Sequence, residues 1–167
     1  MNNRIKSCLF FLVLIFGLHG CSKDDSKGSL RPIVEEYFET YKARKDFTKF
    51  LSFYDEQIVL EDIINGDRIV GKRNVRAFLN WDNDKFKLID SIALQVDYLV
   101  VGENKAVAKG HFRPFQWGEV TVGAMHFTTI LTFNEANKII TQVDWINYPY
   151  KMTDEQNKGG SNNWIPQ

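Results

Sequence analysis

Apolar residues at helical spacing dominate the chain between residues 30 and 54. After Pro32, which suits the first turn of a helix, apolar side chains recur at i, i+1, i+4, i+5 and i+8, and these are Ile33, Val34, Tyr37, Phe38 and Tyr41. They form one stripe along a predicted amphipathic helix. A second, shorter helix is predicted from the spacing of Phe47, Phe50, Leu51 and Tyr54, with Asp46 as its N-terminal cap.

A strand, a turn and a third helix are predicted in residues 54–81. The strand covers residues 58–62 and ends in two adjacent carboxylates, Glu61 and Asp62. Residues 65–67 form a turn, since Asn and Gly tolerate positive φ. Gly71 precedes a helix whose apolar residues are Val75, Phe78 and Leu79 and which ends near residues 80–81. Because Asp62 stands where a strand leaves the sheet beside the start of a helix, we expect it to face a pocket.

Beyond residue 90 the apolar period changes to two, which indicates β-strands. The pattern predicts strands at 91–101, 106–114, 120–133 and 138–148, with turns at 102–105 and 134–137 and a loop at 115–119. In the first strand the predicted inner face carries Ile92, Leu94, Val96, Tyr98 and Val100. In the next two strands one face carries Ala108, Gly110, Phe112, Met125, Phe127, Thr129, Leu131 and Phe133.

Helices followed by a run of strands indicate the α+β class. We therefore expect N-terminal helices packed in a strongly curved antiparallel sheet, with an opening at one end where a ligand can bind. The length of 167 residues fits one domain, and the 14% of aromatic residues allow a substantial core. No internal repeat indicates a second domain.

The N-terminus has the pattern of a targeting segment. Arg4 and Lys6 precede an apolar run that is short for a membrane span and ends in Leu18-His19-Gly20-Cys21. This ending resembles a lipobox, in which a bacterial signal peptide is removed and lipid is attached to the cysteine; an ordinary secretory peptide is the alternative. Residues 22–25 resemble the acidic tag of surface-exposed lipoproteins in the Bacteroidetes, so we expect an outer-membrane location in the cell envelope.

This processing sets the expected organisation of the mature protein. We expect a signal peptide at 1–20, a flexible tether at 21–29, one domain at 30–149 and a polar tail at 150–167, in which Trp164 and Ile165 could dock on the domain. Without the first twenty residues, 19 basic residues stand against 21 acidic ones. That balance argues against a nucleic-acid partner. Cys8 leaves with the signal and Cys21 carries lipid, so no free thiol or disulfide remains.

The order and spacing of several segments resemble the SnoaL-like branch of the nuclear-transport-factor-two-like superfamily. The segments are a helix with an inward Tyr37, the sequence FYDE at 53–56, LED at 60–62, the pattern G-K-x-x-V-x-x-F at 71–78, and the long strands. The resemblance covers roughly residues 30–148. It implies a cone-shaped fold with a deep pocket between helices and sheet, and dimers formed through the outer face of the sheet.

The resemblance also implies candidate site residues. Asp62 is similar in position to the general base of ketosteroid isomerase, and Tyr37 to its oxyanion-binding tyrosine if one residue is inserted between Ala43 and Asp46. Thr129 stands where that enzyme has a second, protonated acid, so steroid isomerase activity is not expected. SnoaL-like cyclases have an acid on the last strand, and Asp144 is the equivalent here. The expected ligand-binding residues beside these are Phe112, Thr129, Gln142 and Ile146.

Each candidate also has a plain structural explanation. Asp62 could cap a turn, Asp144 could form a salt bridge on the outer face, and Tyr37 could be a core residue. His111 and His126 are expected to be exposed or to face a dimer partner, and Trp117 could be a lid or a surface contact. No histidine spacing indicates a metal site, and no cofactor is expected.

Two hypotheses of function follow. In the first, a lipid-anchored protein binds a small, largely apolar molecule, with or without proton-transfer chemistry at Asp62. In the second, the domain is a non-catalytic, dimeric interaction module. We favour the first, and the sequence leaves catalysis open.

Overall fold

The computed structural model describes residues 29–149. The three helices are α1 (Arg31–Ala43), α2 (Phe47–Ser52) and α3 (Lys72–Leu79). Nine strands follow the order β1 (Tyr54–Asp62), β2 (Asp67–Val70), β3 (Phe86–Leu88), β4 (Leu94–Val101), β5 (Lys105–Phe112), β6 (Phe115–Trp117), β7 (Val120–Val122), β8 (Met125–Phe133) and β9 (Ile139–Ile146). The predicted signal peptide, Cys21, the tether up to residue 28 and the tail after residue 149 lie outside the described residues.

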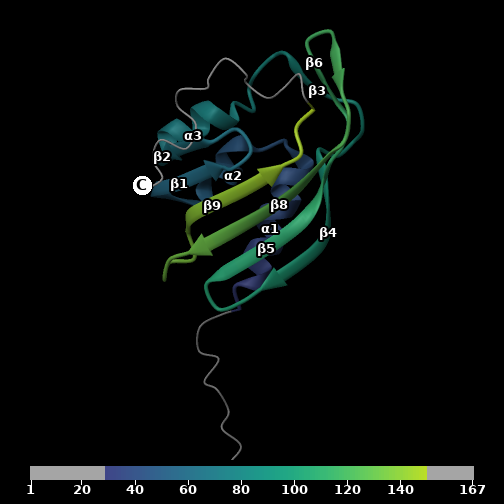
Figure 1. Cartoon of the computed structure of the whole chain (residues 1–167). Helices are drawn as coiled ribbons and strands as arrows, with labels where there is room; N and C mark the ends of the chain where they lie inside the picture. Colours follow the sequence, from purple (N-terminus) through teal and green to yellow (C-terminus); the bar gives the residue numbers. More distant parts are fainter. Residues whose placement is uncertain (1–28, 150–167) are drawn as a thin grey trace, which may run out of the picture.

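A six-stranded sheet curves around the first helix and confirms the α+β cone fold. Its strand order is β2-β1-β9-β8-β5-β4, and α1 and α2 lie on its concave side (Figure 1). Neighbouring strands are antiparallel except β1 and β9, which pair in parallel. The sequence pattern did not predict this parallel pair, which places Asp62 at the end of the first strand beside Asp144 near the end of the last one.

The first two helices form where the apolar spacing predicts them. Val34, Tyr37 and Phe38 of α1 are buried against the sheet. The Asp46 carboxylate accepts a hydrogen bond of 2.8 Å from the backbone N–H of Lys49, which confirms the predicted cap of α2. However, α2 ends at Ser52, and Tyr54 begins β1 instead of extending the helix.

Strand boundaries and one strand face differ from the expectation. The predicted strand 120–133 is divided into β7 and β8. A β-bulge between Val96 and Tyr98 inverts the alternation in β4. As a result Tyr98 and Val100, predicted to face inward, are 63% and 46% exposed, while Leu99 packs against the core.

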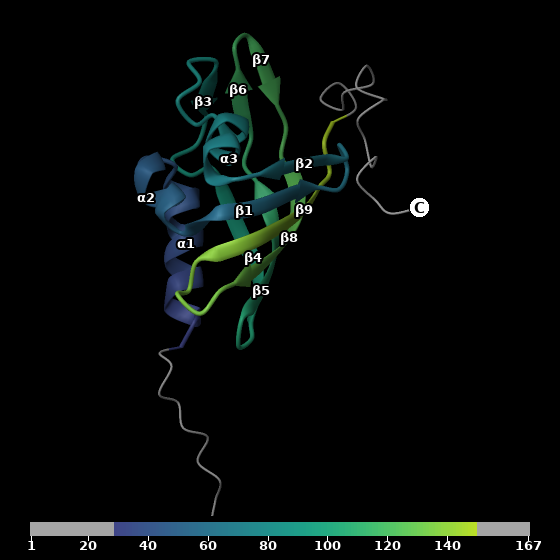
Figure 2. The same ribbon diagram turned by 90° about the vertical axis from the view of Figure 1, so that its left-hand side faces the viewer.

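A small three-stranded sheet, β3-β6-β7, extends the molecule beyond the end of α1 that is remote from its N-terminus (Figure 2). Phe115, Val122 and Met125 form its buried cluster. Gly118 has a φ of 61° in the two-residue turn between β6 and β7, a position that favours glycine. Trp117 precedes this turn and is 41% exposed. No helix among residues 29–149 is long and apolar enough to span a membrane.

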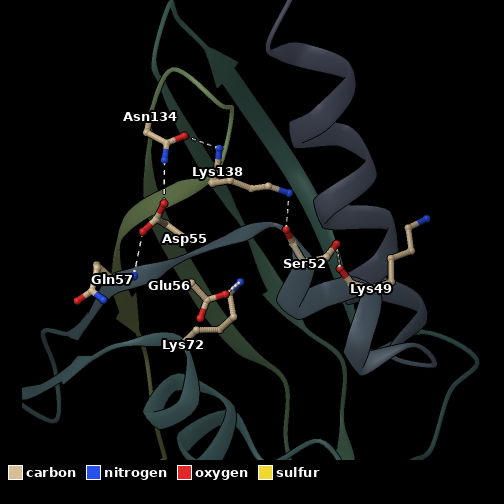
Figure 3. A network of polar contacts seen from close by, with 8 residues as sticks. All are labelled: Lys49, Ser52, Asp55, Glu56, Gln57, Lys72, Asn134 and Lys138. Carbon is tan, nitrogen blue, oxygen red and sulfur yellow. Dashed lines mark hydrogen bonds and ion pairs between the residues drawn. The ribbon is translucent and has the colours of Figure 1, made fainter.

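Polar contacts fix the start of β1 against the turn between β8 and β9 (Figure 3). Asn134 Nδ2 donates to Asp55 Oδ2 at 2.9 Å, and Lys138 Nζ donates to the carbonyl of Ser52 at 2.7 Å. Nearby, Lys72 of α3 pairs with Glu56 of β1. The contacts of Asn134 and Lys138 join residues 79 and 86 positions apart in the chain, and they support the parallel pairing of β1 with β9.

Candidate functional site

A buried glutamine links α1, β1 and β9 on the concave side of the sheet. Gln142 is 3% exposed, and its Oε1 accepts a hydrogen bond from Tyr54 at 2.7 Å. The Tyr37 hydroxyl lies 3.1 Å from the same Oε1 and 3.0 Å from the Tyr54 hydroxyl. Each phenol has one proton, so Tyr37 donates to one of these two oxygens at a time. Burial raises the pKa of both tyrosines, which keeps them neutral donors.

The other end of this amide holds a carboxyl group. Gln142 Nε2 donates to Asp144 Oδ2 at 2.7 Å. The orientation of the amide is thereby fixed, because only its oxygen can accept from the phenols and only its nitrogen can donate to the carboxylate. Loss of solvation is the main cause that raises the pKa of Asp144 from 3.8 to about 6, against the lowering effects of Thr129 and Gln142.

Thr129 faces Asp144 directly across the antiparallel pair of β8 and β9. Its side chain is 5% exposed, and Oγ1 has no hydrogen-bond partner of good geometry within the described part of the chain. The hydroxyl is nevertheless close enough to Asp144 to lower the pKa of the carboxyl. A buried hydroxyl without a full hydrogen bond costs free energy, so this position is suited to a water molecule or a polar ligand atom.

These polar groups line a narrow cavity, which we call the chamber; half of its lining residues are aromatic. Its volume is about 20 Å³, and it is lined by Tyr37, Phe38, Tyr41, Leu94, Phe112, Phe127, Thr129, Gln142, Asp144 and Ile146. That volume is enough for roughly one water molecule and is far below the several hundred Å³ of typical ligand pockets. Asp144 is the only ionisable carboxyl among the lining residues.

Asp62 does not line the chamber. It is 1% exposed, and its Oδ1 accepts hydrogen bonds of 3.1 Å from the backbone N–H groups of Ile64 and Asn65. Its Oδ2 accepts a 2.5 Å hydrogen bond from the hydroxyl of Tyr148, just beyond β9. Burial and the Asp62 charge both raise the pKa of Tyr148. In this structure Asp62 therefore caps the turn after β1.

The two carboxyl groups are nonetheless neighbours. Asp62 is paired with Asp144 in the parallel register of β1 and β9. The Asp62 charge is one of the causes that raise the pKa of Asp144. Their surroundings separate their roles, because Asp62 is enclosed by hydrogen-bond donors whereas Asp144 faces the chamber.

The structure brings most of the predicted site residues together. Six of them line the chamber, namely Tyr37, Phe112, Thr129, Gln142, Asp144 and Ile146. Asp62 and Trp117 do not line it. Sequence reasoning missed Tyr54 and Tyr148 as hydrogen-bond donors and Phe38 as a wall residue. The inward stripe of the first helix includes Phe38 and could have indicated it, whereas Tyr148 follows the last strand without any local signal.

Metal ligation finds no support in the described chain, since residues 29–149 contain no cluster of His, Cys, Asp and Glu suited to a metal. His111 and His126 face each other on the outer side of the sheet, with ring centroids 6.4 Å apart, and His111 Nδ1 lies 3.2 Å from Asp97 Oδ2. Neither histidine lines the chamber.

Comparisons with known proteins agree with this fold. Residues 34–142 match the family model of the SnoaL-like domain. The matched segment covers more than half of the chain, contains Thr129 and Gln142 of the chamber, and ends two residues before Asp144. No curated protein matches the sequence.

Several solved structures share the fold at low sequence identity. A candidate SnoaL-like polyketide cyclase from Shewanella putrefaciens is 17% identical, with a TM-score of 0.58 over 71% of this chain and 89% of that protein. A candidate ketosteroid isomerase from Kribbella flavida is 16% identical, with a TM-score of 0.54 over 72% and 79%. An epoxide hydrolase from M. tuberculosis is 13% identical, with a TM-score of 0.56 over 70% and 81%. At these identities the likeness establishes the fold alone.

The pKa of Asp144 predicts an unusual dependence of stability on pH. The folded state binds this proton more tightly than the unfolded state, so ionisation of Asp144 costs stability as pH rises from 3.8 through about 6. The Asp144→Asn variant keeps a neutral acceptor for Gln142. We expect equal stability of variant and wild type below about pH 4, and a more stable variant, by at most about 3 kcal/mol, above about pH 7.

Urea unfolding at a series of pH values measures this difference. Asp84→Asn, at an exposed position, is the matched control and should show no such trend. A variant that is less stable than wild type at neutral pH, with the difference vanishing in acid, would contradict the proton-binding role of the partly buried Asp144.

Proposed function

This chain belongs to the SnoaL-like domain family, and we propose that it binds a small, largely apolar molecule at the chamber, which is enlarged when a lining side chain moves. Asp144 and Thr129 would form hydrogen bonds with the polar group of that molecule. The observation that carries the proposal is a pair of polar side chains, Asp144 and Thr129, in a cavity lined mostly by aromatic and aliphatic residues, with the Thr129 hydroxyl lacking a full hydrogen bond. A buried hydroxyl in that condition calls for an explanation, and a polar atom of a ligand supplies one.

The chemistry of the pair favours an uncharged ligand with one hydroxyl or carbonyl group. With a pKa of about 6, Asp144 changes its protonation state near neutral pH and can accept from or donate to such a group. Aromatic walls then bind the apolar remainder. The fold neighbours described as a cyclase, an isomerase and an epoxide hydrolase support the use of this fold for small organic molecules.

We propose that the protein binds its ligand, and the proposal does not require that it converts the ligand chemically. Asp62, expected from the resemblance to be a general base, has its carboxylate enclosed by two backbone N–H groups and Tyr148. If the protein does catalyse proton transfer, Asp144 is better placed than Asp62, because it lines the chamber. Thr129 in place of a second acid argues against a steroid isomerase.

The location in the cell also belongs to the proposal. The lipobox-like ending at Cys21 and the apolar run before it support a lipid anchor in the bacterial cell envelope. Residues 21–28 would then separate the lipid from the first described residues. Only this anchor, and no part of the domain, is proposed to enter the membrane.

A second candidate function is supported by an apolar row on the outer face of the sheet. The strand registers place Val100 beside Val107, Val107 beside Ile130, and Ile130 beside Val143. Tyr98 and Trp145 flank this row and are 63% and 39% exposed. Such a surface fits a homodimer, which is compatible with ligand binding on the concave side.

Phenol and benzene test the proposed site, because they differ by one hydroxyl group. Thr129→Val removes the Thr129 hydroxyl from the chamber with little change in side-chain volume. We expect it to weaken phenol binding about tenfold, the effect of roughly one hydrogen bond, and to leave benzene binding unchanged. Amide NMR spectra recorded during titration measure both affinities.

Thr128→Val is the matched control, since Thr128 is the adjacent residue of β8 and lies on the other face of the strand. Equal effects of the two variants on phenol, or no shift of any chamber resonance in wild type, would overturn the proposed site.

The lipid anchor is tested separately by Cys21→Ser in the full-length chain. Without the cysteine no lipid can be attached, so the protein should move from the membrane fraction to the soluble fraction of the envelope, and metabolic labelling with palmitate should disappear. Retention of the variant in the membrane fraction would count against the anchor.

A further inference from the structure

A surface groove lies between α1 and β4, the edge strand of the large sheet. It has a volume of about 170 Å³ and is lined by Glu35, Phe38, Glu39, Lys42, Leu94, Gln95, Val96 and Leu99. The helix contributes residues at i, i+3, i+4 and i+7, which is one face of α1. The floor of the groove is apolar, and its charged residues come from the helix.

Two residues, Phe38 and Leu94, line both this groove and the chamber. Phe38 is 5% exposed, and its ring packs edge-on against Tyr37 with the centroids 4.9 Å apart. The groove is open to solvent, and the chamber, which shares Phe38 and Leu94 with it, holds Asp144 and Thr129. The two spaces are therefore neighbours that have side chains of α1 and β4 in common.

We infer that the groove and the chamber are two parts of one ligand site, entered between α1 and β4, with the Phe38 ring as the partition between them. This inference rests on the proposed function and adds the entry side and the shape of the ligand. The chamber of about 20 Å³ is too small for an organic molecule. The groove supplies several times that volume once the Phe38 ring turns to another rotamer.

The charges around the groove indicate the class of ligand. Lys42 Nζ lies 3.1 Å from Glu39 Oε1, and Arg31 pairs with Glu35 at 3.3 Å. Each charge of the helix face therefore has an opposite partner, and none is reserved for a ligand. An uncharged, elongated and mainly apolar molecule fits best, with a single hydroxyl or carbonyl group that reaches Thr129 and Asp144.

The inference predicts different behaviour for a short and a long probe. Once the Phe38 ring has turned aside, phenol is short enough to occupy the chamber side of the enlarged site alone, whereas para-phenylphenol, with two rings in line and one hydroxyl, extends into the groove. Val96→Phe narrows the groove. We expect this variant to weaken the binding of para-phenylphenol at least about tenfold and to change the binding of phenol little. Val100→Phe adds the same volume on the same strand at a position that is 46% exposed, and it should affect neither probe.

The partition is tested with Phe38→Leu and Phe38→Ala. Both variants shorten the barrier, so para-phenylphenol should bind more tightly and faster than in wild type; the Leu variant retains a branched side chain in case the Ala variant does not fold. Amide resonances of both Gln95 and Gln142 should shift with para-phenylphenol, while phenol should shift only those of the chamber.

The outcomes separate the inference from the proposed function. If Val96→Phe leaves the affinity for para-phenylphenol unchanged while chamber resonances shift, the ligand enters elsewhere, and the inference fails although the proposed function stands. If neither probe shifts chamber resonances in wild type or in the Phe38 variants, both the proposed function and the inference fail.

Discussion

The hydrogen bonds of one buried amide determine how the concave side of this protein is organised. Gln142 accepts from Tyr54 of β1, lies within hydrogen-bond distance of Tyr37 of α1, and donates to Asp144 of its own strand. An amide in this position has to be satisfied at both ends, because a buried polar group without a partner is costly. The helix, the first strand and the last strand are therefore held in one arrangement, with Asp144 among the residues that line the chamber.

Two carboxyl groups on neighbouring strands acquire different tasks from their surroundings. Asp62 is enclosed by donors at the end of β1 and closes a turn, whereas Asp144 faces aromatic rings and a single amide donor. Loss of solvation therefore dominates at Asp144 and raises its pKa to about 6. Ionisation of this carboxyl lowers the stability of the fold, so stability alone does not explain its presence. Carboxyl groups with such shifted pKa values are typical of sites that bind or react.

The chamber is nearly filled, which shapes the account of ligand binding. Rings of the aromatic core leave room for about one water molecule beside Asp144, so an organic ligand requires a side chain to move. Phe38 is the side chain that separates this space from the larger groove on the α1–β4 side. Selectivity would then depend on the length of the ligand as well as on its polar group.

Local patterns in the sequence predicted the parts of this fold that depend on local interactions. The stripe of α1, the Asp46 cap and the inward faces of β5 and β8 follow from spacing alone. The bulge in β4 was not predicted, because an extra residue in one strand leaves no trace in the apolar alternation. Tyr98 and Val100 are therefore exposed, although the alternation predicted that they face inward.

The arrangement of the site depends on contacts between distant segments. The parallel pairing of β1 with β9, which sets Asp62 beside Asp144, joins residues 82 positions apart, and the bond from Tyr148 to Asp62 spans 86 positions. The resemblance to SnoaL-like domains indicated Asp144 and its neighbours on β9, but the hydrogen bonds that enclose Asp62 could only be seen in three dimensions.

The function proposed for this protein depends on Asp144 as the proton-binding carboxyl of the chamber. An NMR titration of the Asp144 carboxyl carbon in the wild-type protein measures this property. We expect a midpoint near 6, well above the ordinary value of 3.8. A midpoint at or below that ordinary value would show a solvated or ion-paired carboxylate, and Asp144 could then not have this role.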